Sequence, residues 1–233
     1  SKYFVEKTGD DNKPGISKNE AFLTLNRAFL FLQEGDTLII GEGVFTITCP
    51  LEWMGGITIL GQGPEKTIIQ AAKRPSGDKN SIFTHSVLYN MKYIGCETEI
   101  PVSLIDGLTI QNGAAPMKEP TPTSVGGGIK NFAGLRIKNC VIQNNSALNG
   151  GGIYNAGALN IENSVIRNNH AFNQDGAVFN TIDATFSHSE CEFISNTQDC
   201  IDTASHILSD FENGFSGSHG TNGNYEGGFK ENS

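Results

Sequence analysis

The stretches GGGIKNFAGLRIKNCVIQNN (Gly126–Asn145) and GGGIYNAGALNIENSVIRNN (Gly150–Asn169) decide the fold, because one can be laid over the other with 24 residues between equivalent positions. A looser third copy, DGAVFNTIDATFSHSECEFISN, starts at Asp175, and a fourth starts at Asp199 with DCIDT. An earlier half-copy, LIDGLTIQNG, starts at Leu104. Self-similarity at a fixed period of this length is the signature of a solenoid.

The register of the copies places like residues in columns. One column holds Ile129, Ile153, Val178 and Ile201, and another holds Ile110, Ile142, Ile166 and Phe193. Each copy contains three short alternating segments, and none is long enough to bury its apolar face without a neighbouring copy. The pattern predicts an all-β fold, a single-stranded right-handed parallel β-helix with three sheets and about 23–28 residues per coil.

Asparagines recur at the expected corners. Asn131, Asn155 and Asn180 follow the first segment of successive copies, while Asn139 and Asn163 separate the second segment from the third. Asn tolerates the left-handed conformation of a sharp corner, and its amide can bond to the amide of the next coil. The spacing therefore predicts hydrogen-bonded columns of Asn side chains.

The chain reads as one domain, residues 1–233. Asn19–Gln33 carries Phe22, Leu25, Phe29 and Leu32 at helical spacing, which predicts an amphipathic α-helix within residues 17–34 that caps the first coil. The β-helix coils are expected over residues 37–207, and residues 208–233 form an irregular segment rich in Gly, Ser and Asn.

Composition excludes some partners. A net charge of -9 repels nucleic acid, and no apolar run is long enough to span a membrane. Cys140 and Cys191 share a column with Ser164 between them, about 9–10 Å apart, which is too far for a disulfide. The pairing of Cys49, Cys96 and Cys200 is left open, and His188 falls in an inward column with Ile161.

Two sets of motifs resemble known families. YFVEKTGDD from Tyr3, EGDTLIIGEGVFTI from Glu34 and GITILGQGPEKTII from Gly56 resemble the N-terminal segment of secreted pectin-lyase-like β-helix proteins. The GGGI and IxxN elements resemble the GGAI and FxxN repeats of the polymorphic outer-membrane protein family. The resemblance implies this fold and an extracellular or cell-surface location, but it leaves the activity open, since the superfamily includes lyases, hydrolases, epimerases, tailspikes and adhesins.

In pectin-lyase-like folds the substrate groove lies along the first sheet, next to the corner with the longest insertions. Here the longest insertion, Gly113–Val125, precedes a GGGI strand, so the GGGI column is the expected first sheet. Alternation points one residue of each strand outward, and a row of small residues is expected to form the groove floor. The outward file is Lys130, Tyr154, Phe179 and Asp202, and the floor is Gly128, Gly152, Ala177 and Cys200. Arg167, His170 and Asp175 lie on the neighbouring corner and complete the expected substrate-binding set.

Aromatic groups beside a cation and a carboxylate suit a sugar chain. The leading hypothesis is an exported adhesin or recognition module that binds an extended polymer, a polysaccharide or cell-surface glycan. One alternative is a polysaccharide lyase or epimerase acting on uronate chains, with Lys130 or Tyr154 as the base. The other is a stalk or spike without a ligand.

No metal site and no cofactor are expected, because the chain lacks the paired acidic cluster that holds Ca²⁺ in pectate lyases. A Ca²⁺ site stays an alternative at Asp199, Asp202, His206 and Asp210, although spacing alone does not place these side chains around one point.

Overall fold

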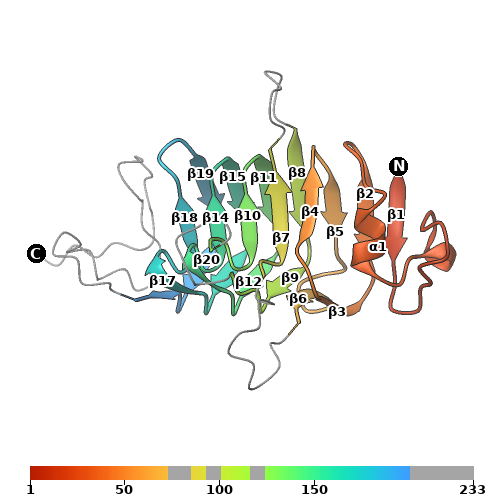
Figure 1. Ribbon diagram of the computed structural model, residues 1–233, viewed down its shortest axis with the longest axis horizontal. Coiled ribbons are helices and arrows are strands. Elements are labelled where there is room, and N and C mark those ends of the chain that lie inside the picture. Colours follow the sequence, from red (N-terminus) through yellow and green to blue (C-terminus); the bar gives the residue numbers. More distant parts are fainter. Residues whose placement is uncertain (73–84, 93–100, 116–123, 200–233) are drawn as a thin grey trace, which may run out of the picture.

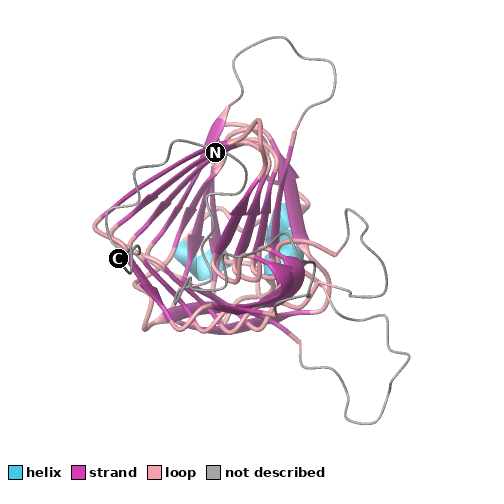
Figure 2. Cartoon of the chain, turned by 90° about the vertical axis from the view of Figure 1, so that its left-hand side faces the viewer, coloured by secondary structure: helices cyan, strands magenta, loops and turns pink. Residues whose placement is uncertain are grey.

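The computed structural model describes residues 1–72, 85–92, 101–115 and 124–199. Short strands wind into coils that stack along one axis, with β1 at one end and β19 near the other (Figure 1). Viewed along that axis, the coils superpose and enclose a three-walled interior (Figure 2). Strand pairing within each wall is parallel throughout, so the prediction of a right-handed parallel β-helix is confirmed.

Three long sheets form the walls. Sheet A consists of β1 (Lys2–Val5), β2 (Thr37–Ile40), β5 (Thr58–Leu60), β8 (Val102–Asp106), β11 (Gly134–Lys138), β15 (Ala158–Glu162) and β19 (Thr185–Ser189). Sheet B consists of β3 (Gly43–Ile47), β6 (Thr67–Ala71), β9 (Thr109–Gln111), β12 (Val141–Gln143), β16 (Val165–Arg167) and β20 (Glu192–Ile194). Sheet C consists of β4 (Leu51–Met54), β7 (Leu88–Met91), β10 (Ile129–Asn131), β14 (Ile153–Asn155) and β18 (Val178–Asn180).

A fourth sheet departs from the predicted three. Sheet D lies in the chain between sheets B and C and consists of β13 (Ser146–Asn149), β17 (His170–Gln174) and β21 (Thr197–Gln198). Its register shifts between Ala147 and Asn149. The corner was expected to be a turn, but in successive coils it is extended enough for parallel pairing.

The predicted inward columns are present. Ile129 pairs with Ile153, Ile153 pairs with Val178, and all three side chains are fully buried. Ile161 pairs with His188, which is half-buried against the rings of Phe186 and Phe193. Each column is thus a ladder of core residues about 4.8 Å apart. Ile201 lies outside the described residues.

Asparagine ladders tie the coils together. Asn131 Nδ2 donates to Asn155 Oδ1 (2.8 Å), and Asn155 Nδ2 donates to Asn180 Oδ1 (2.6 Å), inside the corner between sheets C and A. A second buried ladder runs from Asn145 through Asn169 to Asn196 at distances of 3.0 and 2.9 Å. On the outside, Asn163 donates to Asn139 (2.7 Å), and both residues have the predicted positive φ, 45° and 50°. The same expectation is wrong for Asn131, Asn155 and Asn180, which do not have a positive φ.

The cap differs from the predicted helix. Helix α1 spans only Leu25–Phe29, and a 3₁₀ turn covers Lys18–Glu20. The helix cannot begin earlier because Phe22 takes part in strand-like pairing, with its N–H donating to the Phe4 carbonyl (2.9 Å). Thr24 is the N-cap, and its Oγ1 accepts from the Arg27 N–H. The cap still covers the first coil, since Leu25 and Ala28 are buried in the core.

The cysteines that the structure describes are unbonded. Cys140 and Cys191 are unbonded as predicted, and burial raises the pKa of the Cys140 thiol to about 12. Cys49 is also unbonded, while Cys96 and Cys200 lie outside the described residues.

Among the helices that the structure describes, none has the length and apolar character that a membrane span requires.

Candidate functional site

The outward side chains of sheet C form one file across neighbouring strands. Lys130 pairs with Tyr154 and Tyr154 pairs with Phe179, in the order that the repeats predict. In the other direction Lys130 pairs with Tyr89, and Tyr89 pairs with Glu52. Asp202, the predicted fourth member, lies outside the described residues. The file, with Phe132 beside it, is called the sheet C face below.

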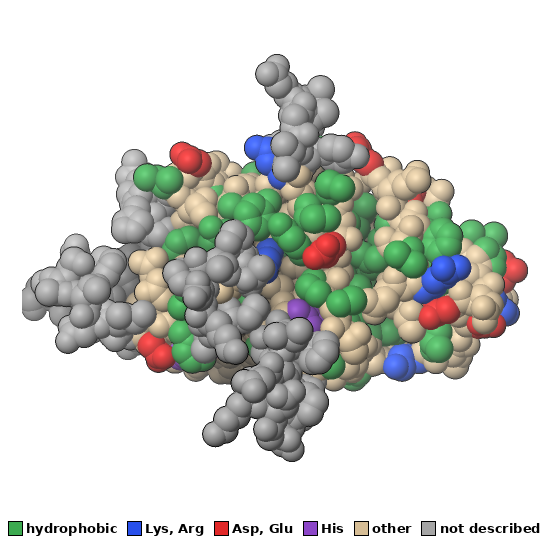
Figure 3. All heavy atoms as spheres, in the orientation of Figure 1, with side chains coloured by type: hydrophobic (Ala, Val, Ile, Leu, Met, Phe, Trp, Pro, Cys, Tyr) green, Lys and Arg blue, Asp and Glu red, His purple; other side chains and the backbone are tan. Residues whose placement is uncertain are grey.

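Aromatic rings run along most of this face. The ring centroids of Tyr89 and Phe132 are 5.6 Å apart, and those of Phe132 and Tyr154 are 5.8 Å apart. Tyr154 and Phe179 stack at 5.2 Å with their planes 6° from parallel. Stacked rings cover part of each other's faces, so the row stabilises itself while each ring stays half-buried rather than fully buried. Figure 3 shows hydrophobic side chains gathered over β10, β7 and β4.

Lys130 is more covered than its outward position suggests. The residue is only 9% exposed, and Nζ lies 5.7 Å from the centroid of the Tyr89 ring, within cation–π range. Desolvation lowers the pKa of the Lys130 ammonium, and the negative charge of Glu52 acts in the opposite direction. Lys130 was predicted as an exposed groove residue, but the structure shows a buried residue whose ammonium lies over the Tyr89 ring.

The two candidate bases are poorly suited to proton abstraction. A general base works best with a pKa near the working pH and must lie within about 3 Å of the proton it removes. Burial raises the pKa of the Tyr154 phenol, which moves it further from neutrality. The pKa of Lys130 moves in the useful direction, but its 9% exposure leaves little access for a substrate.

The predicted groove floor is wrong. Gly128, Gly152 and Ala177 are buried inside the stack. A Cβ on Gly128 would lie 2.6 Å from the Gly152 carbonyl oxygen and 2.9 Å from Asn145 Nδ2. These small residues therefore allow the backbone to pack against its neighbour and the second asparagine ladder. Cys200 lies outside the described residues.

The residues of the neighbouring corner do not join the sheet C face. Arg167 is exposed on sheet B, where its Nε donates to Gln143 Oε1 (2.9 Å). His170 lies on sheet D, hydrogen-bonded to Thr197 Oγ1 (2.9 Å) and 3.6 Å from the Asp199 carboxylate. Asp175 is fully buried at φ 60°. Their sequence positions suggested one corner, but the chain turns each to a different side.

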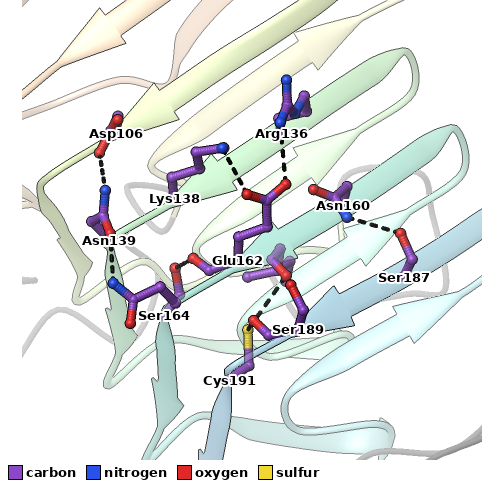
Figure 4. A network of polar contacts seen from close by, with 12 residues as sticks. Asp106, Arg136, Lys138, Asn139, Asn160, Glu162, Ser164, Ser187, Ser189 and Cys191 are labelled. Atoms are coloured by element: carbon purple, nitrogen blue, oxygen red, sulfur yellow. Dashed lines mark hydrogen bonds and ion pairs between the residues drawn. The ribbon is translucent and has the colours of Figure 1, made fainter.

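The outward face of sheet A is polar on β11, β15 and β19. Glu162 lies between Arg136 and Lys138, with contacts of 3.1 and 2.6 Å (Figure 4). The hydrogen bonds from Lys138 and then Arg136 hold the pKa of the Glu162 carboxyl below its usual value. Asn160 donates to Ser187 Oγ (3.0 Å) on the next strand. The side chains of Arg136, Lys138 and Glu162 pair with one another while 30–48% exposed, so they form an ordinary solvated surface.

Three members of the sheet C face escaped the sequence prediction: Glu52, Tyr89 and Phe132. A signal for Tyr89 was present, because Leu88-Tyr89-Asn90 has the same apolar, outward, Asn order as Ile129-Lys130-Asn131 and Ile153-Tyr154-Asn155. Glu52 precedes Trp53 instead of Asn, so the triplet does not identify it.

The described residues contain no cluster of three or more His, Cys, Asp or Glu side chains that could hold a metal ion. Of the four residues proposed for Ca²⁺, Asp199 is described, and Asp202, His206 and Asp210 lie outside the described residues. The Ca²⁺ site therefore stays a prediction.

No protein-family model matches the chain, and no curated protein sequence matches it. Solved structures do match. A pectin methylesterase in complex with a hexasaccharide gives a TM-score of 0.52 at 14% identity, over 88% of this chain and 57% of that one. Pectin methylesterase PemA from Erwinia chrysanthemi gives 0.50 at 14% identity, over 81% and 54%. A rhamnogalacturonan lyase gives 0.50 at 13% identity, over 85% and 53%.

At these identities the likeness shows the fold alone, and the chain spans little more than half the length of these structures. The resemblance to pectin-lyase-like β-helices is thereby confirmed for the fold. The resemblance of the repeats to the polymorphic outer-membrane protein family stays a prediction.

Proposed function

We propose that the sheet C face binds an extended glycan and that the chain works outside the cell, as an adhesin or recognition module. The observation that carries the proposal is the aromatic row Tyr89, Phe132, Tyr154 and Phe179, which crosses four neighbouring strands. With strands about 4.8 Å apart, the row extends for about 14 Å along the axis. A linear polymer laid along that axis contacts several rings at once.

The chemistry of the row fits a sugar chain. Aromatic side chains offer apolar surface to the C–H faces of sugars, and the phenol groups of Tyr89 and Tyr154 offer hydrogen bonds to hydroxyls. The hexasaccharide complex of a pectin methylesterase is an example of a protein of this fold with a bound oligosaccharide. The polar face of sheet A offers no comparable apolar surface on β11, β15 and β19.

The test is affinity electrophoresis of the whole chain through gels that contain a panel of plant, algal and bacterial polysaccharides. The double variant Tyr154→Ala/Phe179→Ala is expected to lose at least about tenfold in affinity for whichever polymer retards the wild type, because it removes two adjacent anchors. The matched control, Asn160→Ala/Ser187→Ala, removes an outward pair from the same two coils on sheet A and keeps wild-type retardation.

The rival functions give different results with the same panel of polysaccharides when products are assayed as well as binding. Unsaturated products, detected by ultraviolet absorbance and lost in Lys130→Ala and Tyr154→Phe, would identify a polysaccharide lyase. A change in uronate stereochemistry without cleavage would identify an epimerase. Retardation that is equal in wild type and the Tyr154/Phe179 double variant contradicts the proposed face, and no retardation by any polymer favours the stalk.

A further inference from the structure

The charges on the sheet C face cancel. The outward positions of β4, β7, β10, β14 and β18, all of which the structure describes, carry two charged residues, Glu52 and Lys130. The remaining outward positions are aromatic or Met. A surface built to hold a polyanion usually repeats basic groups along the path of the chain, so that each acidic unit meets a cation. These five strands have no such repeat.

Lys130, the one cation at the outward positions of these five described strands, is poorly placed for a carboxylate. A charge-assisted hydrogen bond brings the ammonium nitrogen within about 2.7–2.9 Å of a carboxylate oxygen. Lys130 is 9% exposed, and its Nζ lies over the Tyr89 ring. Glu52, in contrast, is exposed on the edge strand of sheet C, where it repels an approaching anion. The net charge of -9 adds a long-range repulsion.

Apart from the exposed Glu52, the accessible groups are neutral: the half-buried rings of Tyr89, Phe132, Tyr154 and Phe179, and the phenol hydroxyls among them. Such groups recognise C–H surfaces and hydroxyls and provide no compensation for a desolvated carboxylate. A polyuronate would lose hydration on binding and gain no ion pair in return.

We propose that the sheet C face selects uncharged polysaccharide, or the uncharged stretches of a longer chain, and discriminates against polyuronate. The inference rests on the proposed function, whose glycan it specifies. It also separates this chain from uronate-directed lyases and epimerases, the rival reading of the sequence.

The experiment compares polymers that share a backbone and differ in charge. Three pairs serve: hydroxyethyl cellulose with carboxymethyl cellulose, methyl-esterified with de-esterified homogalacturonan, and the propylene glycol ester of alginate with alginate. In every pair for which retardation is measurable, the uncharged member is expected to bind at least about tenfold more tightly. Its affinity is expected to change less than about twofold between low and high salt, because the contact contains no exposed ion pair.

A charge reversal provides the matched variants. Glu52→Lys adds a cation beside the aromatic row and is expected to raise the affinity for the carboxylated polymers severalfold. Glu192→Lys changes the net charge equally but lies exposed on β20 of sheet B, away from the row, and is expected to leave the preference between charged and uncharged members as in wild type.

The outcomes separate the two claims. Tighter binding of the carboxylated member, weakened by salt, overturns the inference and leaves glycan binding by the face intact. An equal gain from Glu52→Lys and Glu192→Lys also overturns it, because the discrimination would then reside in the total charge. Absence of binding to all six polymers and to the wider panel overturns the proposed function as well.

Discussion

Sheets A and C are built by the same coils and line the same core, but their outward faces have opposite character. On β11 and β15 the outward positions carry Arg136, Lys138 and Glu162, which pair with one another in solvent. On β14 and β18 the outward positions carry Tyr154 and Phe179, which are half-buried and stacked. The inward residues of both sheets form the same kind of aliphatic column.

The difference shows that coil stacking constrains the two sides of a strand unequally. Inward positions must repeat, because each fills a layer of a shared core. Outward positions need only avoid clashes with the next coil, so a sustained aromatic row there is not a requirement of the fold. Sheet A shows that the coils are stable with a polar exterior, which is why we propose a binding role for the aromatic exterior of sheet C.

The largest loss of stability is expected at the buried corner between sheets C and A. Asn155 is fully buried and donates from Nδ2 to Asn180 Oδ1 (2.6 Å) and the Thr185 carbonyl (3.0 Å), while Oδ1 accepts from Asn131 (2.8 Å). Asn155→Ala leaves these groups unsatisfied in the core and is expected to lower the free energy of unfolding by about 3–4 kcal/mol in urea denaturation.

Asn163→Gly is the control for that prediction, since it removes an exposed ladder bond in the same stack and suits the positive φ of the position. It is expected to cost less than about 1 kcal/mol. Equal losses of unfolding free energy in the two variants would show that burial does not determine how much an asparagine ladder contributes to stability.

The next largest loss of stability is expected when outward-facing pairs of side chains on sheets C and A are removed. Tyr154→Ala/Phe179→Ala removes a stacked, half-buried aromatic pair and is expected to lower the free energy of unfolding by about 1–2 kcal/mol. Asn160→Ala/Ser187→Ala removes a solvent-facing hydrogen bond on sheet A and is expected to change it by less than about 0.5 kcal/mol. A loss of several kcal/mol for the aromatic pair would indicate that the row serves mainly to hold the coils together.

His188, on the inward side of β19, is expected to make the stability of the protein depend on pH. Desolvation lowers the pKa of His188 below its ordinary value of 6.5, so the unfolded chain takes up a proton at this residue before the folded chain does. The free energy of unfolding is therefore expected to fall as the pH drops below about 6.5. His188→Ile, which continues the column of Ile137 and Ile161, is expected to flatten this slope between about pH 7 and pH 5. An unchanged slope would mean that the half-buried ring titrates alike in both states.

The smallest effect is expected on the outward face of sheet A. Glu162→Gln removes the carboxylate that Arg136 and Lys138 share. Because the groups face solvent, thermal unfolding is expected to show only a slight loss of stability, which disappears at about 1 M salt. A large loss that persists at high salt would contradict the description of this face as an ordinary solvated surface.

The sequence alone was sufficient to predict the structural features that repeat from coil to coil. The columns headed by Ile129 and by Asn131 follow from register alone, because residues one coil apart must stack in a parallel solenoid. Cys140 and Cys191 were correctly predicted to be unbonded by the same reasoning.

Features that depend on neighbours outside the repeat were not predictable in this way. The period gives the direction of the Lys130 side chain but not its burial: the residue is 9% exposed, and its Nζ lies 5.7 Å from the centroid of the Tyr89 ring. The helical spacing of Phe22 was real, but pairing with Val5 overrides it. Asp175 looked available beside the first sheet, but its positive φ turns that corner inward.

Hydroxyl-radical footprinting with mass spectrometry tests the central claim most directly, because it reports the solvent exposure of individual aromatic side chains. The chain is labelled with and without the uncharged polysaccharide that it binds most tightly. Binding at the sheet C face predicts that oxidation of Tyr89, Phe132, Tyr154 and Phe179 falls severalfold, while Val102 and Leu104 on β8 of sheet A are unaffected. Protection of the sheet A residues, or oxidation of the aromatic row that is unchanged at saturating polymer, would contradict it.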